Sequence, residues 1–83
     1  MLLILLITAH LQGQSVPKYD IEKLYWDCDT SYMQGTLEPK DVMRCLDISD
    51  IFVEERFNGD TEKYKEYWQA NKESQWRQRG YSK

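Results

Sequence analysis

The chain has 83 residues and a formal net charge of −3 at pH 7. Its length allows one domain at most. The mildly acidic, mixed charge argues against a general affinity for nucleic acid or anionic lipid, because both kinds of partner favour a basic excess.

The chain begins with an apolar run at residues 1–9, far shorter than the roughly 20 residues that a membrane-spanning helix needs. Gly13 and Ser15 then place small residues where a signal peptidase prefers them, for a cut before Val16. We therefore predict a signal peptide over residues 1–15, a single helical domain over residues 16–83, and no stable membrane insertion after cleavage. The absence of Lys and Arg before the apolar run is unusual for a signal peptide, and the alternative is a buried N-terminal helix.

Amphipathic patterns predict three helices, at about residues 20–34, 39–57 and 61–78. Asp20 is a good N-cap for the first helix, and Gly35 ends it. Pro39 suits the first position of the second helix, where its missing N–H has no cost. Asn58 and the glycine after it stop the second helix, and Asp60 caps the third. Because no long segment alternates apolar and polar residues, we expect an all-α, three-helix domain.

The two cysteines, Cys28 and Cys45, both lie on apolar stripes of the first two helices. In an antiparallel hairpin, residues equidistant from the turn lie level, because each helix rises about 1.5 Å per residue. The midpoint of residues 28 and 45 falls between Thr36 and Leu37, inside the expected turn. We therefore predict a Cys28–Cys45 disulfide that staples the hairpin, as small exported domains often require.

The same arithmetic pairs Ile21 with Phe52 and Tyr25 with Ile48 across the hairpin. The alternative for the cysteines is a pair of free buried thiols in an intracellular protein. A catalytic dithiol is disfavoured, because it would use a Cys-x-x-Cys spacing.

The first helix has a second apolar side, formed by Tyr19, Trp26 and Met33 at intervals of seven residues. The aromatic stripe of the third helix, which begins at Tyr64, would cover this side in a simple core. If it stays uncovered, the three residues form a patch that binds another protein. They are therefore candidate partner-binding residues.

Asp27, Asp29, Ser31 and Glu38 have the spacing of calcium ligands in an EF-hand loop. The position that needs glycine for the sharp turn is Tyr32, which makes calcium binding a weak alternative. The competing interpretation is that the first helix continues through this segment, with both aspartates solvated or hydrogen-bonded on its flanks. We expect no metal and no cofactor.

Few residues could support catalysis. The single histidine, His10, lies in the predicted signal peptide, and both cysteines are predicted to be paired. We therefore expect that the protein is not an enzyme. Basic and aromatic residues mix after Trp76, but cations in the last turn of a helix complement its dipole, and we expect no nucleic-acid partner.

Short motifs between about residues 19 and 72 form a combination: Tyr25-Trp26-Asp27-Cys28-Asp29, Gln34-Gly35-x-Leu37, Cys45, Phe57-Asn58-Gly59-Asp60, and Tyr67-Trp68 with Asn71-Lys72. Together they resemble a group of small exported proteobacterial proteins of unknown function. The resemblance implies an envelope location in a Gram-negative bacterium, supports the paired cysteines, and implies no activity.

We therefore expect a non-catalytic, periplasmic or secreted module that binds another protein of the bacterial envelope. The alternative is a small calcium- or ligand-binding helical protein with a degenerate loop at residues 27–38.

Overall fold

The computed structural model describes the chain over residues 18–82, and its side chains over residues 21–82. It contains three α-helices and one 3-10 turn: α2 (Lys18–Gln34), η1 (Pro39–Asp41), α3 (Val42–Phe57) and α4 (Thr61–Gln78). No strand occurs over these residues, so the prediction of an all-α, three-helix domain is confirmed. The predicted signal peptide, residues 1–15, lies outside the described part of the chain.

The helix ends follow the boundary signals of the sequence, with two corrections. Gly35 ends α2 at a φ of 78°, and Asn58 ends α3 in the left-handed region. Asp60 caps α4, since its carboxylate accepts two backbone N–H groups of the first turn at 3.1 Å each. Asp20 lies inside α2 and is not its N-cap. Pro39 begins a 3-10 turn, which commonly precedes an α-helix, and not α3 itself.

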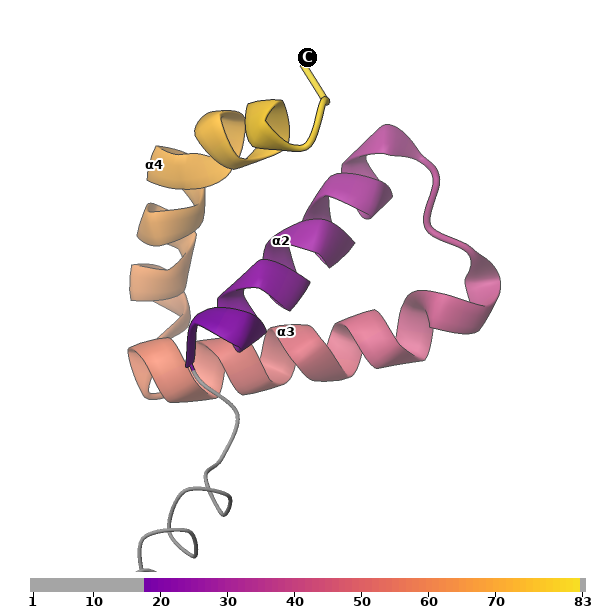
Figure 1. Ribbon diagram of the computed structural model, residues 1–83. Coiled ribbons are helices and arrows are strands. Elements are labelled where there is room, and N and C mark those ends of the chain that lie inside the picture. The colour runs from indigo at the N-terminus through magenta and orange to yellow at the C-terminus, as the bar shows by residue number, and fades with distance from the viewer. Residues whose placement is uncertain (1–17, 83) are drawn as a thin grey trace, which may run out of the picture.

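The three helices are arranged roughly as the sides of a triangle (Figure 1). Helices α2 and α3 are inclined to each other, and the connection at residues 35–38 joins their more widely separated ends. Helix α4 leaves the far end of α3 and returns towards the C-terminal half of α2. Over the described residues, no helix is both long and apolar enough to span a bilayer.

The core is mostly aromatic and lies where all three helices meet. Tyr25, Trp26, Ile48 and Phe52 are buried together, and Ile21 packs against them. Both pairs expected from the hairpin register therefore belong to one cluster. Tyr25 also stacks on Phe52, with ring centroids 4.5 Å apart. This diagonal contact arises because long side chains on a helix lean towards its N-terminus, so the two rings lean towards each other.

The predicted disulfide is present. Cys28 and Cys45 are bonded, with their Cα atoms 5.7 Å apart, and the bond closes a loop with a sequence separation of 17 residues. Cys28 packs against the core cluster. The disulfide therefore connects α2 and α3 beside the core.

Removing the disulfide should destabilise the domain markedly. A cross-link across a loop of this length contributes about 3 kcal/mol to the free energy of unfolding in the chain-entropy model. We expect a loss of this size for the Cys28→Ala/Cys45→Ala variant, measured by urea denaturation followed by circular dichroism. A variant as stable as the oxidised protein would show that packing alone holds the hairpin.

Candidate binding groove between α2 and α3

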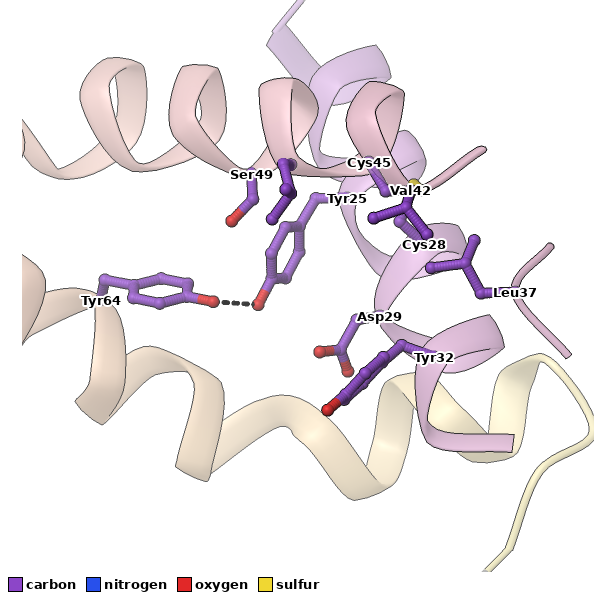
Figure 2. A pocket seen from close by; sticks show the side chains of 10 residues that line it. Tyr25, Cys28, Asp29, Tyr32, Leu37, Val42, Cys45, Ser49 and Tyr64 are labelled. Carbon is purple, nitrogen blue, oxygen red and sulfur yellow. Dashed lines mark hydrogen bonds between the residues drawn. A yellow bond between two sulfur atoms is a disulfide. The ribbon is translucent and has the colours of Figure 1, made fainter. Parts of the chain in front are cut away.

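A cavity of about 400 Å³ lies between α2 and α3, beside the disulfide (Figure 2). Helix α4 contributes one residue to it, and the connection after α2 contributes another. The lining residues are Tyr25, Cys28, Asp29, Tyr32, Leu37, Val42, Cys45, Leu46, Ser49 and Tyr64. The disulfide forms part of its wall, so the groove depends on the element that staples the two helices.

The rim of this groove carries apolar side chains that face solvent. Tyr32 is 70% exposed, Leu46 54% and Val42 39%. Single exposed apolar residues are common on protein surfaces, but a contiguous set around a cavity marks an interaction site. Val42, Leu46 and Ser49 follow helical spacing on α3, so one face of that helix forms one wall.

Two tyrosine hydroxyls meet at the end of the groove nearest α4. The hydroxyls of Tyr25 and Tyr64 lie 2.5 Å apart in a hydrogen bond, and Ser49 lies at the same end (Figure 2). Burial raises the pKa of the Tyr25 hydroxyl, and its hydrogen bond with Tyr64 raises it further, so it stays protonated. A hydrogen bond between two hydroxyls uses one hydrogen and one acceptor lone pair, which leaves further hydrogen-bonding capacity for a bound group.

Asp29 lines the groove, but both of its carboxylate oxygens are hydrogen-bonded to α4. One oxygen accepts the indole N–H of Trp68 at 3.1 Å, and the other accepts that of Trp76 at 2.8 Å. Trp76 is buried, and the Lys72 ammonium lies 4.5 Å from the centre of the Trp68 ring. The Asp29 carboxylate therefore acts as a structural anchor between α2 and α4.

The residues of the calcium alternative are not arranged as a calcium loop. Asp27, Asp29 and Ser31 all lie inside α2, whereas Glu38 lies beyond its end, because the helix continues to residue 34. The Asp27 carboxylate accepts a hydrogen bond from Arg79 at 2.8 Å and another from Lys23 at 3.0 Å. Within residues 18–82, no group of three or more acidic, His or Cys side chains could hold a metal ion.

The structure also changes the role of the predicted partner-binding residues. Trp26 is fully buried, with Tyr67 of α4 against it at a ring-centroid distance of 6.3 Å. Met33 is half-buried, and the Tyr19 side chain lies outside the described part of the chain. Helix α4 therefore covers α2 at Trp26, which is not available to a partner.

Glu22 joins all three helices at the other end of α2. Its carboxylate accepts hydrogen bonds from Arg56 of α3 at 2.7 Å, from Trp26 at 3.4 Å, and from the hydroxyl of Tyr67 of α4. Burial raises the pKa of Glu22, but the hydrogen bonds from Tyr67 and Arg56 and the Arg56 charge outweigh it, and the net shift is downward. The Asp27 pKa is lowered in the same way by Arg79 and Lys23 against the effect of burial.

No protein-family model, curated protein or solved structure matches this chain. The groove and its surroundings therefore carry the functional argument. Sequence reasoning missed the groove, although it placed Cys45 on an apolar stripe of the second helix. The missing information was the inclination of α2 against α3, which leaves part of that stripe uncovered.

Replacing Asp29 should cost more stability than replacing an exposed aspartate. In Asp29→Ala, two indole N–H groups lose a charged acceptor, one of them on the buried Trp76, and we expect a loss of about 3 kcal/mol. The matched control is Asp47→Ala on the exposed surface of α3, which should change the free energy of unfolding by less than about 0.5 kcal/mol. Equal losses in the two variants, measured by urea denaturation, would contradict the anchoring role.

Stability should fall in acid, in part through Glu22 and Asp27. Their pKa values are lower in the folded than in the unfolded chain, so their contribution is complete above the unfolded values, about 4, and is lost as pH falls through the folded values. We expect Glu22→Gln to reduce the difference in unfolding free energy between pH 7 and pH 3. Glu66→Gln, at an exposed position of α4, should leave that difference unchanged, and an unchanged difference in Glu22→Gln would refute this assignment.

Proposed function

We propose that this protein is a non-catalytic, exported module that binds another protein of the bacterial envelope through the groove between α2 and α3. The observation that carries this proposal is the cavity of about 400 Å³ with exposed apolar side chains on its rim. Such surfaces mark binding sites in proteins that are otherwise well packed. The binding surface is thus the groove, and not the Trp26 side of α2.

The chemistry of the groove suits binding better than catalysis. Its polar side-chain groups are four hydroxyls and the Asp29 carboxylate, and both oxygens of that carboxylate are occupied by indole N–H groups. A general base needs a free acceptor within reach of a substrate proton. These side chains can orient a bound group but offer no activated nucleophile.

The exposed rim favours a protein segment over a small ligand. A small-molecule site usually encloses most of the surface of its ligand. Here the rim residues Tyr32 and Leu46 are more than half exposed, which leaves room for a partner that extends beyond the cavity. A folded or helical segment can use the groove and the adjacent surface of α3 together.

Export is supported by the disulfide and by the signal-peptide pattern of residues 1–15. Disulfides form and persist in oxidising compartments such as the periplasm or the extracellular space. The resemblance to small exported proteobacterial proteins agrees with a periplasmic or secreted location. The Cys28–Cys45 bond links α2 to α3 and also lines the groove. Binding through the groove would therefore depend on an oxidising compartment.

Site-specific photocrosslinking in the producing cells tests the groove. A photoreactive benzoylphenylalanine at Leu46 should give one discrete adduct with another protein. The same group at Gln69, on the exposed side of α4, is the control and should give none. Adding Val42→Asp to the Leu46 variant should remove the adduct without unfolding the domain, because Val42 is partly exposed at the start of α3.

Equal adducts from Leu46 and Gln69, or an adduct that survives Val42→Asp, would contradict binding in the groove. The absence of any adduct from Leu46 would also count against it. Circular dichroism of each variant confirms that the helices are retained.

A further inference from the structure

The surface of α3 beside the groove is acidic as well as apolar. Between Cys45 and Glu55 this helix carries four acidic residues and no Lys or Arg. All four acidic side chains are exposed, and none forms an ion pair with a described residue: Asp47, Asp50, Glu54 and Glu55. Their charge is therefore not neutralised by an ion pair within the part of the chain that the structure describes.

Helical spacing places these carboxylates in rows with the apolar side chains. Leu46, Asp50 and Glu54 follow one another at intervals of four residues, so two carboxylates continue the row that begins on the groove rim. On the next row, Asp47 lies between two exposed apolar residues, Met43 and Ile51. The outer surface of α3 is thus an alternation of apolar and acidic positions.

This combination excludes several occupants of the groove. Anionic lipid would be repelled by the carboxylates. A second copy that paired α3 with α3 would place the same four carboxylates against each other. The α4 surface of a second copy could not fill the groove, because the large exposed apolar residues of the described chain lie on α2 and α3. The apolar segment at residues 1–9 of this chain has no Lys or Arg to match the acidic rows.

Resting on the proposed function, we infer that the groove binds a cationic amphipathic helix of the partner protein. Its apolar stripe would enter the groove against Val42 and Leu46, and its Lys or Arg side chains would face Asp50 and Glu54. From residue 42 to residue 49 the groove wall rises about 10 Å, which matches two turns of a bound helix with apolar residues at i, i+3/i+4 and i+7. A hydrogen-bonding side chain on the same helix could reach the Tyr25 and Tyr64 hydroxyls.

A designed peptide provides the probe. It has fourteen residues, with Leu at helical spacing and Lys elsewhere, and its counterpart carries Glu in place of Lys. Titration calorimetry with the purified oxidised protein should show binding of the Leu/Lys peptide and no binding of the Leu/Glu peptide. Raising the salt concentration should weaken binding, since the carboxylates are exposed to solvent.

Charge-reversal variants test the acidic rows directly. Asp50→Lys/Glu54→Lys should weaken binding of the Leu/Lys peptide at least tenfold, and the same variant should now bind the Leu/Glu peptide. The matched control is Glu66→Lys/Glu73→Lys, which makes the same change of net charge at exposed positions of α4. This control should change the affinity for the Leu/Lys peptide by no more than two- to threefold. Leu46→Ser should weaken binding of the Leu/Lys peptide without changing its preference over the Leu/Glu peptide.

Equal weakening by the two double variants would show that only net charge matters and would overturn the inference. Preference for the Leu/Glu peptide, or binding unaffected by Asp50→Lys/Glu54→Lys, would also overturn it. So would a dimer in analytical ultracentrifugation that disappears in Leu46→Ser, because the occupant would then be a second copy. If the charge variants or the peptide preference overturn the inference, a groove-dependent photocrosslink from Leu46 would still support the proposed function, with a partner of different charge.

Discussion

The Cys28–Cys45 disulfide is the constraint on which the rest of the structure depends, because it fixes one level at which α2 and α3 must meet. Towards the start of α2, large aromatic rings such as Phe52 fill the space between the helices. Towards the connection, the smaller Leu37 and Val42 and the largely exposed Tyr32 line the space, and a cavity remains. The disulfide holds α2 and α3 together, and the size of the side chains on either side of it decides where a core forms and where a groove remains. A domain this small gains much of its stability from such a cross-link, because its core alone is small.

The acidic residues of α2 show how a charged motif can be structural. Asp27 and Asp29 flank Cys28, and together they could be taken for a reactive or metal-binding motif. Each has a partner far along the chain: Asp27 binds Arg79, whereas Asp29 binds two indoles of α4. The whole Asp27-Cys28-Asp29 segment thus holds α2 to the other helices. Four exposed acidic residues of α3 form no ion pair with a described residue, and their charge is available to a partner.

Local signals allowed much of this fold to be predicted. Gly35, Asn58 and Asp60 mark helix ends through backbone conformation and capping, which depend on a few neighbouring residues. The disulfide followed from equal rise along two helices. The groove could not be predicted, because the equal distance of Cys28 and Cys45 from the turn fixes the register of α2 and α3 but not the angle between them. The burial of Trp26 under Tyr67 likewise depends on how α4 returns across α2, which periodicity alone does not determine.

The central claim is that part of the apolar face of α3 is open to solvent and ready for a partner in the free protein. Relaxation of methyl protons by a soluble paramagnetic probe measures this directly in solution. The methyl groups of Val42 and Leu46 should relax strongly, whereas those of Ile48, which is buried on the same helix, should be protected. If the methyl groups of Val42 and Leu46 are protected to the same degree as those of Ile48 in the monomeric protein, the groove is closed in solution. That result would contradict binding through an open groove.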